Sequence, residues 1–423
     1  MTWKSADQWL LKKFRRITSS DAFFPEIDGL RFLAILCVVL FHSNTYILNK
    51  APGIRLLSEH SWIYTHVFGP VFLAGQQGVE LFFVISGLIL SLPFARAQLG
   101  LGQKPSYLKY LKRRLTRLEP PYMLTTVFFF FAAIVVVKNV HAASLWPSLL
   151  ASLTYTHNFF YPRELPRINC VLWSLEIEIQ FYLLAPAICR LYFSIRNASA
   201  RRIAGLLSVG LWAFVADRIP GLNLLHFGYF FVSGLVLCDI VCSNGSYCGI
   251  FRSPVSAALG AVMLAALLWT DFTKPGNRIL AVAFPCLIVL FYLVVLLNSF
   301  WKRIFSHTLL VVIGGMCYSI YLLHYPLISQ VGRFMLRFGR GWGFGPFFCL
   351  QLATYVTVVL AVSALFFKTV ERPCMRKEWP SELRARLRAW PWWPRQREAA
   401  SGALPSAILE QAKASGGLEK IER

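Results

Sequence analysis

Long apolar runs separated by short polar and basic clusters dominate this 423-residue chain. Most runs hold about 17 to 25 residues, the length an α-helix needs to cross the hydrocarbon core of a bilayer. The pattern therefore predicts an all-α fold, a polytopic transmembrane helical bundle of about ten spans. We expect the spans at 29–48, 69–92, 119–137, 170–190, 203–217, 223–242, 254–271, 279–300, 306–328 and 347–369.

The segment 145–160 is also apolar, but it is short and contains Pro147 and His157. We expect a helix that lies at the outer interface or dips into the membrane. A full span here would move the basic residues between the fourth and fifth spans to the outside, against the rule that cytoplasmic loops carry most Lys and Arg.

Composition and charge agree with a membrane protein. Hydrophobic residues make up 56% of the chain and charged residues 15%, which excludes an ordinary soluble domain. With both termini in the cytoplasm, the predicted outer loops hold eleven of the 43 Lys and Arg residues. The net charge of +23 therefore reflects orientation in the membrane, and we expect no nucleic-acid partner, since no stripe of interleaved aromatics and arginines lies outside the spans.

Three parts are expected along the chain: a cytoplasmic N-terminal segment (1–26), a transmembrane domain (27–375) and a cytoplasmic C-terminal tail (376–423). The tail contains LRARLRAWPWWPRQR, a basic stretch with Trp and Pro that suits anionic lipid headgroups. The ten cysteines are scattered, and the closest trio has neither a CxxC pair nor a histidine at ligand spacing. We therefore expect buried thiols and no metal.

The first span carries the clearest ionisable residues, which are costly in a membrane and point to function. Arg31 and His42 are eleven residues apart, so they differ by about 20° on a helix and lie about 16 Å apart along it. Asp28 shares this face. The stripe predicts a conduit towards His42; the alternative is that Arg31 anchors at the headgroups while His42 bonds a neighbouring helix.

The fourth span adds acidic residues. Glu176 and Glu178 are about 200° apart on a helix, so only one can face a given cavity. Glu178 shares its face with Ser174, and Glu176 lies nearer Trp173. The depths of Glu178 and His42 roughly match, which predicts a Glu–His pair for general-base catalysis; the alternative is an ion pair that holds the bundle together.

Seven basic residues and no acidic residue lie between Arg96 and Arg117. Arg114 and Arg117 are three residues apart on one helical face, and two guanidinium groups so placed suit phosphate contacts. Binding of anionic lipid headgroups is the alternative. Further polar candidates within apolar runs are Ser86 in the second span and Tyr321 and His324 in the ninth; His324 suits an interfacial position equally well.

Six motifs, in order from about residue 27 to 373, resemble the acyltransferase family 3 of integral membrane O-acyltransferases. They are IDGLRFLAILCVVLFH with its Arg-x10-His spacing, GVELFFVISGLIL, RRLTRLEPPYML with its Arg-x-x-Arg pair, WSLEIEIQFYLL, YSIYLLHYPLI and VERP. The resemblance implies about ten spans and transfer of an acyl group, usually acetyl, from cytoplasmic acyl-CoA. The acceptor it implies is a hydroxyl of a cell-surface glycan or glycolipid, such as O-antigen or exopolysaccharide, at a bacterial inner membrane.

Residue by residue, the resemblance marks Arg31 and His42, Arg114 and Arg117, and Glu178. The family pattern WSLxxEEQFY has two acids, and here Ile179 replaces the second while Glu176 adds another. On this hypothesis the arginines hold acyl-CoA, and His42 acts either as general base or as transient acyl carrier. Two other classes stay open: a transporter or flippase for a polar lipid or acylated glycan, and a membrane sensor without chemistry.

Overall fold

The computed structural model describes residues 3–17, 23–51, 55, 58–136, 141–216, 218–243, 246–273, 276–337, 344–376 and 378–388. The chain divides into two units, 1–376 and 377–423. In the second unit the described residues form the helix α19 (Trp379–Arg388). The rest of this section concerns the first unit.

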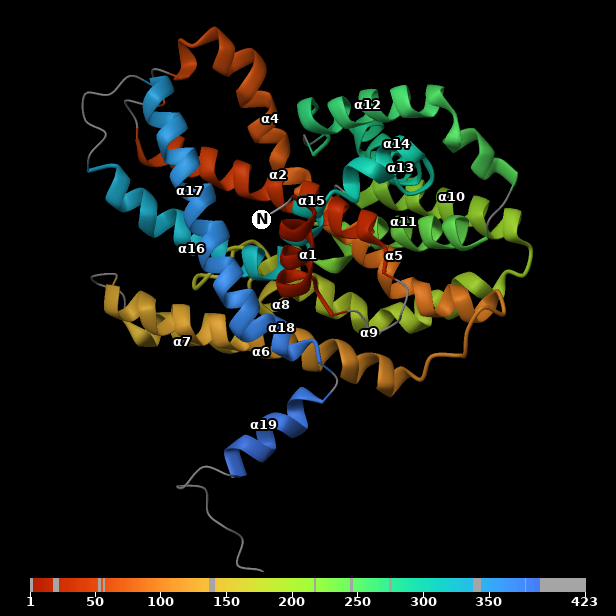
Figure 1. Cartoon of the computed structure of the whole chain (residues 1–423), viewed down its shortest axis with the longest axis horizontal. Helices are drawn as coiled ribbons and strands as arrows, with labels where there is room; N and C mark the ends of the chain where they lie inside the picture. The colour runs from red at the N-terminus through yellow and green to blue at the C-terminus, as the bar shows by residue number, and fades with distance from the viewer. Residues whose placement is uncertain are drawn as a thin grey trace, which may run out of the picture. The chain divides into compact units, whose positions relative to one another are not determined.

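The first unit consists of helices joined by turns and loops, with no strand among its described residues, so the all-α class is confirmed (Figure 1). The N-terminal segment forms α1 (Trp3–Phe14). Five long helices follow at the centre of the bundle, where one continuous apolar core joins them: α2 (Pro25–Lys50), α5 (Gly78–Gln98), α9 (Leu172–Ser194), α11 (Leu224–Cys242) and α13 (Arg278–Leu297).

Other helices surround this centre. In α11, 67% of the most apolar stretch is buried, against 28% in α6 (Tyr107–Val136) and 22% in α10 (Ala198–Ala216), so these two face outward. The remaining elements are α4 (Gly69–Ala74), α7 (Ala142–Leu153), α8 (His157–Phe160), α12 (Pro254–Trp269), α14 (Ser299–Phe305), α15 (Thr308–Gly315), α16 (Cys317–Met335), α17 (Phe344–Phe366), α18 (Arg372–Cys374), and the short η1 (Tyr64–Phe68), η2 (Gly75–Gln77), η3 (Ser246–Arg252) and η4 (Phe367–Glu371).

Eight of the described helices are long and apolar enough to cross a membrane, and the pair α15 and α16 makes a ninth candidate. The predicted span at 254–271 corresponds to α12, whose 16 residues reach about 24 Å, less than the roughly 30 Å of a bilayer core. The polytopic helical fold is thus confirmed, while the count of ten spans and the cytoplasmic location of both termini stay predictions.

Two predicted elements differ in detail. The ninth span was expected as one helix over 306–328, but α15 and α16 meet at an angle of 70°. A β-carbon at Gly314 would overlap the main-chain oxygen of Asp28, so the break lies directly against the start of α2. The third span begins earlier than expected, since α6 starts at Tyr107 and continues through Pro120 and Pro121. The helix therefore carries the basic segment itself.

The segment 145–160 forms α7 and α8, which are too short to span, as expected. In Figure 1 α7 lies along α6, and the two share a small apolar cluster of Phe130, Leu145, Leu149 and Ile168. Tyr155, between α7 and α8, has a positive φ of 57°, uncommon for a residue with a side chain. Its carbonyl accepts a hydrogen bond from Gln180 of α9, which ties the turn to the bundle.

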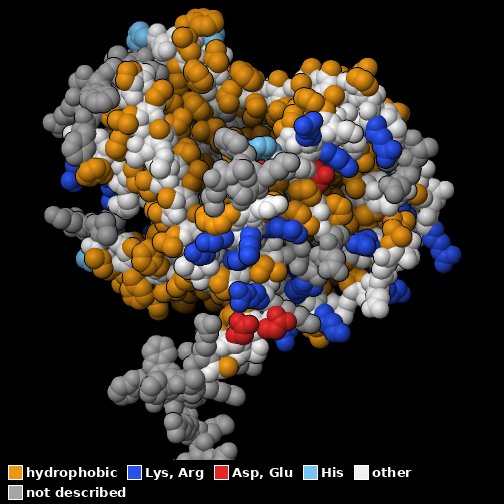
Figure 2. Space-filling model, viewed as in Figure 1, with side chains coloured by type: hydrophobic (Ala, Val, Ile, Leu, Met, Phe, Trp, Pro, Cys, Tyr) orange, Lys and Arg blue, Asp and Glu red, His pale blue; other side chains and the backbone are white. Residues whose placement is uncertain are grey.

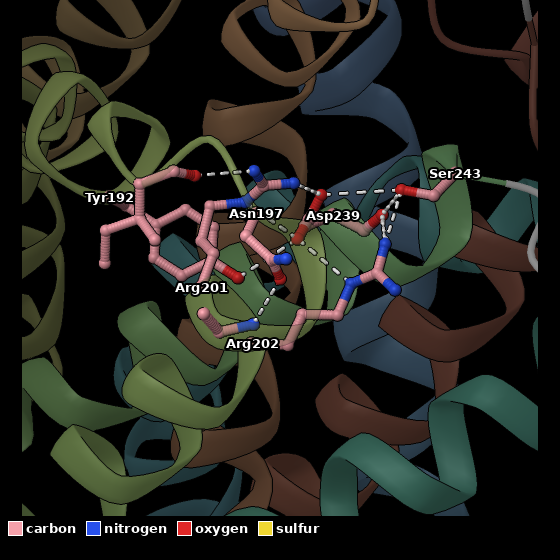
Figure 3. A network of polar contacts seen from close by, with 8 residues as sticks. Tyr192, Asn197, Arg201, Arg202, Asp239 and Ser243 are labelled. Atoms are coloured by element: carbon pink, nitrogen blue, oxygen red, sulfur yellow. Dashed lines mark hydrogen bonds and ion pairs between the residues drawn. The ribbon is translucent and has the colours of Figure 1, made fainter.

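A buried ion network joins the ends of α10 and α11 (Figure 3). Asp239 is fully buried, and its carboxylate oxygens lie 2.7 Å from Nη2 of Arg201 and 3.1 Å from Nε of Arg202. The hydroxyl of Tyr192 on α9 also donates to Asp239. Two guanidinium groups share this one carboxylate, and the network fastens three helices, so removal of the acid would leave buried charge without a partner.

The surface repeats the division between apolar and basic regions. In the view of Figure 2, hydrophobic side chains cover much of the area over α4 and α17, whereas Lys and Arg side chains gather around the positions of α1 and α18. A continuous apolar surface of this kind is unusual for a soluble monomer and suits contact with lipid.

Candidate active site

A pocket with about 900 Å³ of empty space opens among α2, α5, α6, α9 and α16. This space includes the open solvent at its mouth. Helices from both ends of the sequence build its walls, because α15 and α16 pack against α2 while α6 packs against α16 and η4. Polar and charged side chains converge at one end of the pocket: Arg16, Arg31, Arg114, Arg117, Glu178 and Glu371.

Two of the four arginines share one acid. Asp28 is 1% exposed, and its Oδ1 lies 2.5 Å from Nη1 of Arg31 and 3.2 Å from Nε of Arg16. Burial and the nearby charge of Arg31 lower the pKa of the Arg16 guanidinium, while Asp28 opposes the shift. The carboxylate therefore holds both guanidinium groups at the pocket wall.

The other two arginines, Arg114 and Arg117, have no such acid. Of the residues that the structure describes, none places a carboxylate oxygen within 4 Å of either guanidinium. The Nε of Arg117 is buried and has no hydrogen-bond partner, and the nearest aromatic contact of Arg114 is the ring of Tyr110 at 6.0 Å. The carboxylate of Glu371 lines the same pocket and acts on Arg117 through its charge without forming an ion pair. The two guanidinium groups thus keep hydrogen-bonding capacity, which suits this end of the pocket to an anion.

Two carboxylates complete the charged end, and each is held by hydroxyl groups. Oε1 of Glu178 accepts hydrogen bonds from Ser86 at 2.5 Å and from Tyr182 at 2.6 Å. Glu371 accepts from both the main-chain nitrogen and the hydroxyl of Ser319, at 3.0 Å and 2.5 Å. These bonds fix both acids to the helices around the pocket.

The other end of the pocket is mainly apolar and closes on a hydroxyl pair. The side chains of Phe82, Phe83 and Leu175 line the walls there. The hydroxyls of Ser174 on α9 and Tyr321 on α16 lie 2.5 Å apart, and Tyr321 also donates to the carbonyl of Val171. The pocket thus offers an anionic ligand a charged mouth and an apolar chamber.

His42 lies beyond this closed end and does not line the pocket. The ring of Tyr321 is 5.5 Å from that of His324, between ring centres, and Nε2 of His324 is 3.3 Å from Nδ1 of His42. The predicted conduit is therefore not continuous: Arg31 reaches the pocket, but Tyr321 and His324 separate it from His42. His324 itself is fully buried, so the alternative of an interfacial histidine is wrong.

The expected pair of Glu178 and His42 is not formed, because each has other partners. Glu178 bonds Ser86 and Tyr182, whereas His42 bonds the carbonyl of Val38 and His324. The matching depths of Glu178 and His42 did not determine the direction in which each side chain points around its helix. Glu176 faces away from the pocket and accepts from the main-chain nitrogen of Asn158.

Of the predicted candidates, the pocket brings together Arg31, Ser86, Arg114, Arg117, Ser174, Glu178 and Tyr321. Asp28 lies directly behind it, and Trp173 packs instead against Phe83 and Phe227. Sequence reasoning missed Arg16, Tyr182 and Glu371. Glu371 carried a signal, since it stands in VERP at the end of the last apolar run, whereas Arg16 is one of several basic residues near the N-terminus.

The fold and the site together define an integral membrane protein with a charged pocket inside its helical bundle. The family model described as "Acyltransferase domain", of acyltransferase family 3, matches residues 24–368. The chain therefore belongs to this family, which confirms the resemblance seen in the motifs. Nothing in the comparison assigns roles to single residues.

Curated relatives named O-acetyltransferase agree with this family. The chain is 25% identical over 394 residues to "O-acetyltransferase OatA" of Staphylococcus aureus strain NCTC 8325 / PS 47, an alignment of 86% of this chain and 60% of the relative. The proteins of the same name from strains COL and MRSA252 match to the same extent. The chain thus spans about three fifths of the length of these relatives. No solved structure matches it.

Within the described residues, no group of three or more His, Cys, Asp or Glu side chains is arranged to hold a metal ion. The described cysteines are all free thiols, and most are buried or half-buried in the helices.

Proposed function

We propose that this chain is an integral membrane O-acyltransferase that moves an acyl group, acetyl in the simplest case, from acyl-CoA to a hydroxyl of a cell-surface glycan or glycolipid. The observation that carries the proposal is the pair Arg114 and Arg117, two guanidinium groups without an acid partner at the mouth of an apolar chamber. Acyl-CoA has the matching chemistry, with phosphates at one end and an apolar arm at the other. Membership of the family and the similarity to O-acetyltransferase OatA support acyl transfer.

In this proposal the pocket positions the donor. Arg114 and Arg117 bind the phosphates, with Arg31 and Arg16 adding positive charge from the opposite wall. The pantetheine arm extends along Phe82 and Phe83 towards Ser174 and Tyr321. Because Tyr321 closes the pocket, its side chain turns aside before the thioester meets His42.

In this proposal His42 carries out the acyl transfer. As a general base, its ring takes the proton of the acceptor hydroxyl while the oxygen attacks the thioester carbonyl; the C–S bond breaks and the thiolate leaves as CoA after protonation. As a carrier, the ring nitrogen attacks the thioester carbonyl first, the C–S bond breaks and CoA leaves; the acceptor oxygen then attacks the acyl group, the N–C bond breaks and the freed ring nitrogen takes the hydroxyl proton. Trapping of an acyl-histidine after mixing with acyl-CoA alone distinguishes the carrier from the base.

The proposal is tested with purified protein in lipid nanodiscs, acetyl-CoA and an extract of surface glycolipids. We expect release of free CoA that depends on the extract and disappears in His42→Ala, with unchanged thermal unfolding. A flippase or transporter would move the glycolipid without releasing CoA. Full activity of folded His42→Ala would remove His42 from the reaction, and absence of CoA release with every extract from the producing cell would contradict acyl transfer itself.

A further inference from the structure

His42 is in contact with a second histidine that the sequence left without a role. Nδ1 of His42 lies 2.9 Å from the carbonyl oxygen of Val38 and 3.3 Å from Nε2 of His324. The other nitrogen of His324, Nδ1, lies 2.8 Å from the carbonyl oxygen of Tyr321. One contact thus joins two rings from different helices, and each ring is also bonded to a carbonyl of its own helix.

These contacts determine where the protons are. A carbonyl oxygen only accepts hydrogen bonds, so Nδ1 of His324 carries a proton and donates it to Tyr321. In the neutral ring Nε2 of His324 is then an acceptor. By the same reasoning Nδ1 of His42 carries a proton, which it shares between the carbonyl of Val38 and Nε2 of His324.

A proton on Nδ1 leaves the lone pair on Nε2 of His42. Among the residues that the structure describes, none forms a hydrogen bond to this atom. The His42 ring is partly exposed, whereas His324 is fully buried behind it. The free nitrogen of His42 is therefore the one available to an acceptor hydroxyl or a thioester.

We propose that His324 is a positioning residue for His42. It supports, together with the carbonyl of Val38, the tautomer with the proton on Nδ1, and it accepts a stronger hydrogen bond when Nε2 of His42 takes up a proton or an acyl group and the ring becomes positive. This inference rests on the proposed function. It gives His324 the orienting role that the sequence suggested for Glu178.

The surroundings of His324 favour this role over simple packing. Rings of Tyr321 and His42 lie 5.5 Å and 5.0 Å away, between centres, so an apolar ring would suit the space. Burying an imidazole there is costly unless both nitrogens are bonded, and both are. No carboxylate of the described residues lies within 4 Å, so His324 stays neutral and retains the lone pair that His42 needs.

The first test needs no variant at position 324. Full-length protein labelled with ¹⁵N-histidine is studied by NMR in nanodiscs, and the His42 signals are assigned by their loss in His42→Gln. We expect a protonated Nδ1 and an unprotonated Nε2 at His42 in the wild type. A protonated Nε2 with a bare Nδ1 would overturn the proposal, whatever the activity of the protein.

The second test compares substitutions. His324→Phe keeps a ring and removes one of the two acceptors of the Nδ1 proton of His42, so we expect a shifted Nδ1 signal of His42 and a fall in kcat of about a hundredfold or more. His324→Gln retains an acceptor oxygen at the same reach, and we expect activity within about tenfold of wild type. His157→Phe is the matched control, since His157 is equally buried but contacts neither His42 nor His324.

Equal activity and an unchanged Nδ1 signal of His42 in His324→Phe would overturn the positioning role. Failure of the proposed function looks different, because the wild type would then release no CoA with any extract, while the tautomer of wild-type His42 remained as described. If His324→Phe does not fold, the comparison of wild type with His324→Gln and the wild-type tautomer still decide the question.

Discussion

Two arginine clusters lie inside this bundle, and they differ in how their charges are matched. In the Asp239 cluster, one fully buried carboxylate contacts Arg201 and Arg202, and a tyrosine hydroxyl adds a further bond. At the pocket, Arg114 and Arg117 have no acid within 4 Å among the described residues. Both clusters stand at the ends of membrane-length helices, so position alone does not explain the difference.

The difference indicates two roles: one cluster stabilises the fold and the other binds a ligand. A matched cluster repays the cost of burying its charges within the protein itself and fastens helices together. An unmatched cluster keeps unused hydrogen-bonding capacity, which only a ligand can satisfy. Removal of a partner should therefore cost stability in the first cluster, whereas removal of an arginine should cost ligand affinity in the second.

The largest expected effect is on stability, in Asp239→Ala. This change leaves Arg201 buried beside Arg202 without an acid, and we expect the free energy of unfolding to fall by about 3–5 kcal/mol. Thermal unfolding in nanodiscs measures it. CoA affinity per folded molecule should remain within about twofold.

Asp7→Ala is the control for this change, because Asp7 is exposed on α1 and no described residue forms a hydrogen bond or ion pair with it, so its removal should cost about 0.5 kcal/mol or less. A stable Asp239→Ala with weakened CoA binding would reverse the roles of the two clusters.

The next effect is on donor binding, in Arg117→Ala and Arg114→Ala. Each change removes charge-assisted hydrogen bonds of about 1.5–3 kcal/mol, so the dissociation constant for CoA should rise about tenfold to a hundredfold. Stability should hold or increase, since a buried charge without a partner is lost. Calorimetry with CoA measures the affinity.

Arg113→Ala is the matched control for donor binding, because Arg113 neighbours Arg114 in the same helix but is exposed and outside the pocket. An equal loss of affinity in this variant would show a general effect of positive charge.

Asp28→Asn tests an acid that has both roles, since it stabilises the fold and positions arginines of the pocket. Asp28 holds Arg16 and Arg31, but these arginines line the pocket and can reach water there. We expect a loss of about 1–2 kcal/mol in unfolding free energy, less than for Asp239→Ala, because the freed charges are not sealed. CoA affinity should stay within about threefold. A loss as large as that of Asp239→Ala would place Asp28 with the purely structural acids.

The sequence predicted much of the fold, because helices that cross a bilayer are recognisable in the sequence as long apolar runs. It did not predict the 70° break between α15 and α16, since two glycines in an apolar run are equally compatible with a straight helix. It placed Arg114 and Arg117 on one helical face but did not predict that α6 begins as early as Tyr107, because a helix that continues out of the apolar region has no apolar signal there.

For the site, the sequence marked Arg31, Arg114, Arg117 and Glu178, and the structure places all four at one pocket. It paired His42 with the wrong residue. Helical spacing gives direction within one helix, but the rotation of one helix against another depends on packing across the whole bundle. The contact of His42 with His324 therefore became visible only in three dimensions.

The smallest expected effect separates charge from geometry, by replacing one arginine of each cluster with lysine. Arg114→Lys keeps the charge but loses the planar fork, so CoA affinity should fall about threefold to tenfold and become more sensitive to salt. Arg201→Lys loses the paired contacts of Nε and Nη2 with Asp239, so stability should fall by about 1 kcal/mol with no change in CoA affinity. Each lysine should affect only the property its cluster serves, and a change in CoA affinity for Arg201→Lys alone would show that the matched cluster is coupled to the pocket.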